Sequence, residues 1–193
     1  MGLPIKIDAT QRYTYKDYCT WPDNERWEII HGKAYNMSPA PSTEHQRIRR
    51  ELSAQLYAFL KGKPCELFFA PFDVRFPEND ETDDETETVV QPDIVVVCDK
   101  TKLDQRGLRE APDLIIEIIS PSTAGIDMKE KFQLYEYHGV KEYWIVFPHE
   151  KTVQIYTLAK DGNYGKPSTY VSTDMINGGL LEGLIVDLSV VFS

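Results

Sequence analysis

The hydrophobic and polar positions along the chain predict alternating strands and helices. Residues 26–37 are typical of two short strands joined by a turn at residues 31–32. An amphipathic helix is expected next, because apolar residues recur at i, i+4, i+8 and i+11 from Ile48 onward. Thr43, with Gln46 three residues later, fits a capping box at the start of this helix.

Continuous apolar runs predict strands that are covered on both faces of a sheet. Ile94–Val97 is one such run, and Leu114–Ile119 is a second, interrupted only by Glu117. An amphipathic helix is expected from about Gly125 to His138. Further strands are expected over residues 65–76, 142–147, 152–158, 164–171 and 180–188. This pattern indicates an α/β fold: a mixed central β-sheet flanked by helices, with an N-terminal β-hairpin and extra C-terminal strands.

Length and composition limit the class of protein. A chain of 193 residues is expected to form a single domain over residues 1–193. Residues 78–87 carry seven acids and no base, so they predict a solvated, mobile loop. No apolar run reaches 18 residues, so no membrane partner is expected. Cys19, Cys65 and Cys98 are widely spaced, and we expect three reduced, mostly buried thiols in a cytoplasmic protein.

The formal net charge of −10 argues against a protein with an all-over basic surface for nucleic acid. Seven of these charges belong to residues 78–87, and without them the net charge is −3. A basic cluster lies along the first long helix and its exit: Arg47, Arg49, Arg50, Lys61 and Lys63. The acidity therefore excludes strong, metal-free, nonspecific DNA affinity, and it predicts that nucleic-acid binding depends on a divalent cation.

Two acids stand where a charge is costly to bury. Glu117 interrupts an apolar strand, and Asp93 precedes another. Without a functional role, Glu117 would lie at an exposed strand edge, and Asp93 would cap backbone amides at the start of its strand. Asp113 and Glu117 share one strand, and their Cα atoms would be roughly 13 Å apart, too far to bind one cation. Asp93 and Glu117 come from different strands, and neighbouring strands lie about 5 Å apart. This second pair can therefore converge.

A lysine completes the candidate chemistry. The buried face of the helix over residues 125–138 is expected to contain Met128, Phe132 and Tyr135. Lys131 falls within this face, and a buried lysine needs an acidic partner. Asp127, one turn earlier, would make a structural pair, and Glu117 is the other candidate. Two carboxylates and a lysine are typical of a magnesium-dependent phosphodiesterase centre, because Mg²⁺ prefers oxygen ligands and the lysine stabilises charge on the phosphate.

Three stretches resemble the Uma-type restriction-endonuclease-like family, a bacterial branch of the PD-(D/E)XK nuclease superfamily. They are RWEIIHGKAYNMSPAPSTEHQRI (26–48), QPDIVVVCD (91–99) and APDLIIEIISPSTAGIDMKEKFQLYEYHGVKEYWIVFP (111–148). The resemblance extends from about Thr14 to Phe192. It implies a restriction-endonuclease-like core and a metal-dependent endonuclease that hydrolyses phosphodiester bonds, in DNA rather than RNA, with Mg²⁺ or Mn²⁺. It also makes a homodimer an expectation.

The resemblance assigns roles to individual residues. Asp93 and Glu117 match the two acids of the superfamily, and the backbone carbonyl of Ile118 is implied as a further metal ligand. The superfamily usually has lysine two residues after the second acid, where this chain has Ile119, so the resemblance implies that Lys131 supplies it instead. The supporting positions are Glu28, His45, Gln91, Ser120 and Asp127.

Two of these supporting residues carry specific expectations. Glu28 is expected as an extra acid of the metal site, and its alternative is an ordinary polar residue of the hairpin. His45 is expected to contact a substrate phosphate or an acid of the site, and its alternative is a surface histidine at a helix start.

Two other functions compete with the endonuclease. Because the lysine is displaced from its usual position, the chain could instead be a catalytically inactive nuclease-fold protein that acts as a binding or assembly module. A two-carboxylate glycosidase would need an acid pair and no metal, and both the lysine and the family resemblance disfavour it.

Overall fold

Six strands form a mixed sheet between two helical layers in the computed structural model, which describes residues 7–22, 24–37, 40–121 and 124–193. The strand order is β12-β11-β10-β9-β6-β3. The pair β9 and β10 is parallel, whereas the other neighbours are antiparallel. The strands are β3 (Glu66–Phe69), β6 (Ile94–Val97), β9 (Leu114–Ile118), β10 (Glu142–Phe147), β11 (Thr152–Thr157) and β12 (Ser168–Val171).

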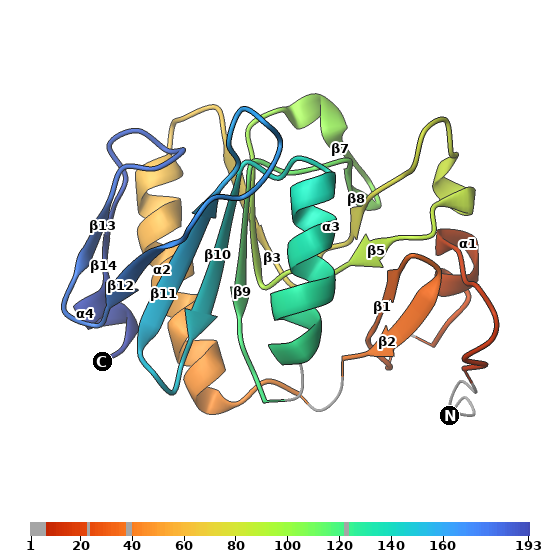
Figure 1. Ribbon diagram of the computed structural model, residues 1–193, viewed down its shortest axis with the longest axis horizontal. Helices are drawn as coiled ribbons and strands as arrows, with labels where there is room; N and C mark the ends of the chain where they lie inside the picture. Colours follow the sequence, from red (N-terminus) through yellow and green to blue (C-terminus); the bar gives the residue numbers. More distant parts are fainter. Residues whose placement is uncertain (1–6, 23, 38–39, 122–123) are drawn as a thin grey trace.

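A second sheet of short strands, ordered β2-β1-β5-β4-β8-β7, contains the expected N-terminal hairpin. Its strands are β1 (Trp27–Ile30), β2 (Lys33–Asn36), β4 (Val74–Arg75), β5 (Val89–Val90), β7 (Leu103–Asp104) and β8 (Gly107–Arg109). The hairpin turn places His31 and Gly32 at φ values of 49° and 76°, where glycine carries no steric penalty. This sheet lies to the right of the larger one in Figure 1.

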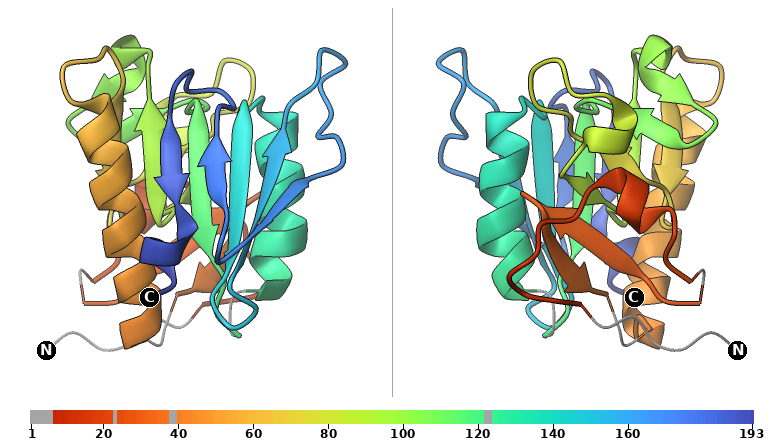
Figure 2. Two further views of the ribbon diagram at one scale, coloured as in Figure 1. Left: turned by 90° about the vertical axis from the view of Figure 1, so that its left-hand side faces the viewer. Right: turned by 90° about the vertical axis from the view of Figure 1, so that its right-hand side faces the viewer.

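Two helices cover opposite faces of the larger sheet (Figures 1 and 2). On one face, α2 (Thr43–Leu60) buries Ile48, Leu52 and Leu56. The π-helical turn η3 (Ile126–Lys131) and α3 (Phe132–Tyr137) cover the other face. Side chains alternate along β6 and β9, so their even-numbered residues pack in the α2 layer and their odd-numbered apolar residues in the α3 layer. This two-sided burial explains the continuous apolar runs in the sequence.

The remaining elements are short. They are α1 (Tyr15–Tyr18), the 3₁₀ turns η1 (Asp83–Glu85) and η2 (Lys100–Lys102), and the C-terminal β13 (Met175–Asn177), β14 (Ile185–Asp187) and α4 (Leu188–Val191). The C-terminal strands pair with each other as a separate two-stranded sheet and lie against α2. Within the described parts of the chain, no helix is both long and apolar enough to cross a membrane.

Several predicted boundaries differ from the structure; the strand expected over residues 164–171, for example, begins only at Ser168. The strand expected over residues 65–76 is two strands, β3 and β4, which belong to different sheets because Pro71, preceded by a cis peptide bond, interrupts the ladder. The N-cap of α2 is Ser42, whose hydroxyl accepts the His45 N–H, so the capping box at Thr43 is wrong. The last expected strand, over residues 180–188, shortens to β14 and leads directly into α4.

The acidic segment 78–87 is less solvated than expected. It does join two antiparallel strands, β4 and β5, but it contains η1 and is tied back to the protein. The fully buried guanidinium of Arg75 pairs with Asp83 and Asp104, and Arg109 also pairs with Asp83. A buried arginine requires such partners, so the segment is held to the protein at Asp83 rather than solvated along its whole length, and its mobility stays a prediction.

The expected reduced thiols are also a wrong prediction, because Cys65 and Cys98 form a disulfide. Cys65 directly precedes β3 and Cys98 directly follows β6, and the register Glu66↔Val97 brings the two cysteines opposite each other. Cys19 is free, but exposed rather than buried. The spacing of the cysteines along the sequence does not predict this disulfide, because the register between β3 and β6 brings the two cysteines together.

We expect the double substitution Cys65→Ser and Cys98→Ser to lower the free energy of unfolding by about 2–4 kcal/mol, because the disulfide closes a loop of 33 residues. Urea unfolding followed by tryptophan fluorescence measures this. Reduction of the wild-type protein with dithiothreitol should give the same loss, and Cys19→Ser provides the matched control. A wild-type unfolding curve that is insensitive to dithiothreitol and equal to that of the double variant would contradict the disulfide.

Candidate active site

Asp93 and Glu117 converge at one end of the larger sheet. The strands β6 and β9 are antiparallel neighbours with the register Ile94↔Ile116, so Asp93 and Glu117 follow as the next opposed pair. The backbone N–H of Asp93 lies 3.3 Å from Glu117 Oε2, and Asp93 Oδ2 accepts the N–H of Ile118 at 2.9 Å. Asp113 lies at the other end of β9, where it contacts Lys141 and the Cys98 N–H. The preference for Asp93 over Asp113 as the partner of Glu117 is therefore consistent with the observed geometry.

Lys131 is the centre of a buried cluster of carboxylates. Its Nζ lies 2.9 Å from Glu117 Oε1, 2.9 Å from Glu28 Oε1 and 3.3 Å from Asp127 Oδ1. The four side chains are each at most 5% exposed. The sequence left open whether Lys131 pairs with Asp127 or with Glu117, and the structure pairs it with both.

Lys131 is buried, as the helical pattern predicts, whereas Met128, expected on the same buried face, is 50% exposed. The reason is that residues 126–131 form a π-helical turn, which is wider than an α-helical turn. The turn brings Asp127 and Lys131 inward and leaves Met128 on the surface. Because π-helical turns are frequent at functional sites, this departure strengthens the case for the cluster.

The small sheet contributes Glu28 and Gln91. Glu28 lies on β1, and its Oε1 accepts the backbone N–H of Gln91 at 2.7 Å in addition to its contact with Lys131. The Gln91 side chain accepts hydrogen bonds from Arg26 and donates to Tyr18 and Asp73. Gln91 therefore links the lysine cluster to a second polar network near the N-terminus, which involves Arg26, Tyr18 and Asp73.

His45 reaches the site from the first turn of α2. Its Nε2 lies 3.0 Å from Asp93 Oδ2, and the ring is buried, with Nδ1 unpartnered among the described residues. The expected contact with an acid of the site is thus present. Ser120 lies two residues after the end of β9, and its carbonyl accepts the Ala124 N–H; residues 122 and 123 lie outside the described residues.

One further residue joins the cluster that the sequence did not suggest. Tyr135, on α3, donates its hydroxyl to Glu117 Oε1 at 2.9 Å and is fully buried. The sequence gives only one indication of this role: Tyr135 lies four residues after Lys131 on the same helical face. That position is equally typical of an aromatic residue of the core. A second ring, Tyr143 on β10, donates to the backbone carbonyl of Asp127.

Burial dominates the electrostatics of the cluster. It raises the pKa of the Glu117 carboxyl well above its usual range; Lys131 opposes this shift, while Asp127, Asp93 and Glu28 add to it. Burial alone would lower the pKa of Lys131, but its attraction to Glu117, Glu28 and Asp127 outweighs burial and raises it. Three carboxylates, those of Glu28, Glu117 and Asp127, thus face one lysine, an excess of negative charge that a divalent cation would offset.

The residues fit a magnesium ion better than a zinc ion. Across the described ranges, no group of three or more His, Cys, Asp or Glu side chains is arranged to hold a metal. Magnesium is usually bound by one or two carboxylates together with water and substrate phosphate. Asp93 and Glu117 would supply such a pair, and Asp93 Oδ1 accepts no hydrogen bond from a described residue. The Asp93 side chain is 15% exposed, so the cluster can be approached from its side.

We expect Tyr135→Phe to lower the free energy of unfolding by about 1–2 kcal/mol, because Glu117 loses a hydrogen bond that orients it. The variant should also slow the metal-dependent cleavage that the sequence resemblance implies, by roughly 10- to 100-fold. Tyr164→Phe is the matched control: this half-buried hydroxyl donates to the Val140 carbonyl, outside the cluster. Equal effects of the two variants on cleavage would contradict a positioning role for Tyr135.

The fold and the cluster define the class: a mixed α/β protein whose carboxylates and buried lysine meet at the end of a central sheet. The chain belongs to the Uma2 family, described as "Putative restriction endonuclease", whose model matches residues 14–190. Two Synechocystis proteins are similar: uncharacterized protein slr1290, 26% identical over 152 residues that cover 77% of this chain and 76% of the relative, and uncharacterized protein sll1609, 27% identical over 113 residues that cover 58% and 59%.

A solved structure has the same fold. It is described as a "putative nuclease" of the DUF820 family from Anabaena variabilis, and it superposes with a TM-score of 0.72 over 93% of this chain and 97% of its own. The sequence identity is 20%, so the likeness concerns the fold. The family expected from the sequence motifs is confirmed.

Proposed function

We propose that this protein is a magnesium- or manganese-dependent endonuclease that hydrolyses phosphodiester bonds in DNA, with Asp93, Glu117 and Lys131 as its catalytic residues. The larger sheet with α2 and α3 then corresponds to a restriction-endonuclease-like core. The observation that carries the proposal is the meeting of Asp93 and Glu117 on neighbouring strands, with the Lys131 amine 2.9 Å from Glu117. Membership in the Uma2 family supports the same reaction class.

Each residue has a distinct part in the proposed reaction. Asp93 and Glu117, with the Ile118 carbonyl, would hold the cation, which supplies positive charge to the phosphate and acidifies water. Lys131 keeps a positive charge beside Glu117, where an ammonium stabilises the negative charge that develops on the phosphate. His45 orients Asp93, while Glu28, Asp127, Gln91 and Ser120 support the position of Lys131 and of the end of β9.

The chemistry is hydrolysis. A water oxygen bonds to phosphorus as the bond from phosphorus to one deoxyribose oxygen breaks, and the proton lost by the water balances the one gained by the leaving alkoxide. Asp93 is the acid open to solvent, so we expect the scissile phosphate to approach from its side. The more deeply buried Glu28 and Asp127 are then positioning residues rather than catalytic ones.

A catalytically inactive binding or assembly module is the second candidate. The observation in its favour is that Lys131 is already paired with three carboxylates and almost fully buried, as in a purely structural ion cluster. Perturbed buried charges occur in both kinds of site. Only a test for metal binding and cleavage separates the two functions.

The test incubates purified protein with supercoiled plasmid DNA in Mg²⁺, in Mn²⁺ and in EDTA, and titrates Mn²⁺ into the protein by calorimetry. We expect nicked plasmid only with the cation, and loss of nicking in Glu117→Ala and Lys131→Ala. Nicking that survives both substitutions would place the activity elsewhere. Absence of cleavage of DNA and RNA, together with absence of Mn²⁺ binding, would favour the inactive module.

A further inference from the structure

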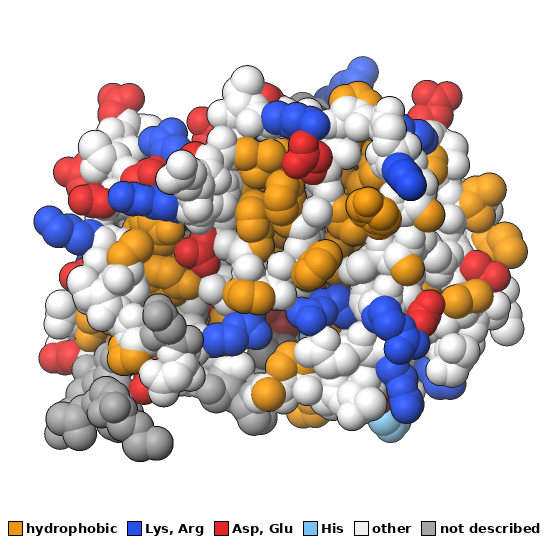
Figure 3. All heavy atoms as spheres, turned by 180° about the vertical axis from the view of Figure 1, so that it is seen from behind, with side chains coloured by type: hydrophobic (Ala, Val, Ile, Leu, Met, Phe, Trp, Pro, Cys, Tyr) orange, Lys and Arg blue, Asp and Glu red, His pale blue; other side chains and the backbone are white. Residues whose placement is uncertain are grey.

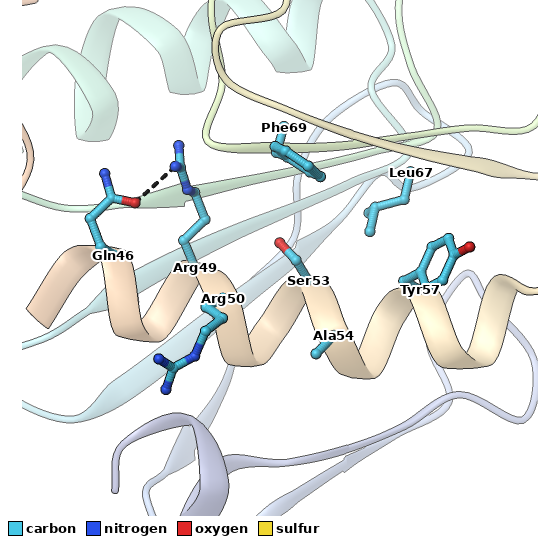
Figure 4. A pocket seen from close by; sticks show the side chains of 8 residues that line it. All are labelled: Gln46, Arg49, Arg50, Ser53, Ala54, Tyr57, Leu67 and Phe69. Carbon is cyan, nitrogen blue, oxygen red and sulfur yellow. Dashed lines mark hydrogen bonds between the residues drawn. The ribbon is translucent and has the colours of Figure 1, made fainter.

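A groove with a volume of about 480 Å³ runs between α2 and β3, beside the candidate active site (Figures 3 and 4). Its walls are mostly apolar and include two exposed aromatic rings, Tyr57 on α2 and Phe69 on β3, which are 61% and 55% exposed. Leu67 lies between them on β3 (Figure 4). Exposed aromatic rings of this size have a cost in water, so their presence together in one groove suggests a ligand.

The groove lies on the α2 face of the sheet, whereas Glu117 and Lys131 lie on the α3 face, and the two approach each other at the end of the sheet, where His45 contacts Asp93. Phe69 pairs with Ile94 in the sheet, so it is one register step from Asp93, and the next residue, Ala70, donates its N–H to the Asp93 carbonyl. On the helix side, Arg49 lies one turn after His45, the residue that contacts Asp93. From His45 to Tyr57 the helix rises about 18 Å, enough to follow several nucleotides away from the site.

The polar groups of the groove suit a polyanion. Arg49 lies at the near end, where its guanidinium donates to the Ala70 carbonyl and to Gln46. Arg50, which is 69% exposed, lines the rim and pairs with Glu51 at 2.6 Å, so Arg49 is the main positive group of the groove. The Ser53 hydroxyl is directed toward Phe69 and Leu67 (Figure 4) and has no hydrogen-bond partner among the described residues.

We propose that this groove binds an unpaired stretch of the nucleic-acid strand next to the scissile phosphate. Aromatic faces within a positively charged groove are the usual means by which proteins hold single strands, because any unpaired base can stack on them. Bases in a duplex already stack on one another and leave no free face for Phe69 or Tyr57. The substrate class is therefore nucleic acid with a single-stranded segment, and this inference rests on the proposed nuclease function.

The test measures binding of fluorescein-labelled (dT)₂₀, (rU)₂₀ and a 20-base-pair duplex by fluorescence anisotropy in Ca²⁺. We expect wild-type protein to prefer a single strand to the duplex, and Tyr57→Ala and Phe69→Ala each to weaken single-strand binding about 5- to 100-fold. Arg49→Gln should reduce the salt dependence of binding by about one phosphate contact. The (dT)₂₀ and (rU)₂₀ arms distinguish DNA from RNA as the source of the strand.

An exposed tyrosine and an exposed arginine outside the groove provide matched controls. Tyr137 is 71% exposed on α3, on the other face of the sheet, and Arg47 is exposed on α2 without lining the groove. Tyr137→Ala and Arg47→Gln should bind the single strand like the wild type. Glu117→Gln should bind it but not cleave it, which separates the groove from the cleavage chemistry.

Three results would overturn the groove proposal. One is wild-type single-strand affinity in both aromatic variants, and a second is duplex binding as tight as single-strand binding. The third is a change in the oligomeric state of the two aromatic variants, measured by light scattering, while their affinity for the single strand stays unchanged. The groove would then be an interface between copies of this chain. In each case plasmid nicking that Glu117→Gln abolishes would leave the proposed nuclease function intact.

Discussion

Replacing Lys131 with methionine is expected to lower the free energy of unfolding by about 3–5 kcal/mol. The lysine is 3% exposed and is the shared counter-charge of Glu28, Glu117 and Asp127. Methionine fills a similar volume but leaves the carboxylates buried without a cation, and removal of one partner from a buried ion cluster costs about this much. Urea unfolding followed by tryptophan fluorescence gives the value.

A matched control is available two residues away. Lys129 lies on the same π-helical turn but is 74% exposed, and its contact with Glu130 is 3.9 Å long. Lys129→Met should leave the unfolding curve unchanged. In the double variant Lys131→Met, Glu28→Gln, part of the lost stability should return, because one unpaired charge is removed. A cost below about 1 kcal/mol for Lys131→Met would show that the lysine does not hold the cluster together.

Glu117→Gln is expected to slow plasmid cleavage by roughly 10³-fold or more while the protein stays folded. The amide keeps the shape of the side chain and still accepts a hydrogen bond from Lys131 or Tyr135, at the position where both now contact Oε1. It removes a carboxylate whose pKa burial raises, so we expect a stability change within about 1 kcal/mol of the wild type. The loss of cleavage follows from the lost negative charge in the proposed cation site.

Glu142→Gln is the matched control for this substitution. Glu142 is a second buried glutamate, on the neighbouring strand β10, and burial raises its pKa as well. It contacts Trp144 and the Leu180 N–H rather than the cluster. Wild-type cleavage is expected in Glu142→Gln. Equal loss of cleavage in the two variants would mean that Glu117 acts through the stability of the sheet.

The sequence predicted the elements that depend on local periodicity. The hairpin β1–β2, the helix α2 and the strands β6, β9, β10 and β11 lie close to where their hydrophobic patterns placed them. The pattern did not reveal that residues 65–76 divide between two sheets. The apolar and aromatic residues continue on both sides of Pro71, and a proline is also tolerated within an edge strand. It also gave no signal for β7 and β8, which are too short to show a period.

The site was predictable wherever a charge interrupts an apolar pattern. Glu117 and Lys131 stand out in this way, and strand spacing selected Asp93 over Asp113 as the partner. The Cys65–Cys98 disulfide and the Arg75–Asp83 pair were not predictable, because each depends on a register or a loop path that no local pattern encodes. Tyr135 was hidden for a different reason, since a buried aromatic residue on a helix face is ordinary core packing until its hydroxyl is seen to reach Glu117.

The most direct test of the metal-dependent site is the rate of plasmid nicking by the wild type and by Glu117→Gln, measured side by side in Mn²⁺ and in EDTA. We predict nicking by the wild type in Mn²⁺ only, at a rate roughly 10³-fold or more above that of the variant. Equal rates in the two proteins, or nicking by the wild type that persists in EDTA, would contradict a catalytic cation site at Asp93 and Glu117.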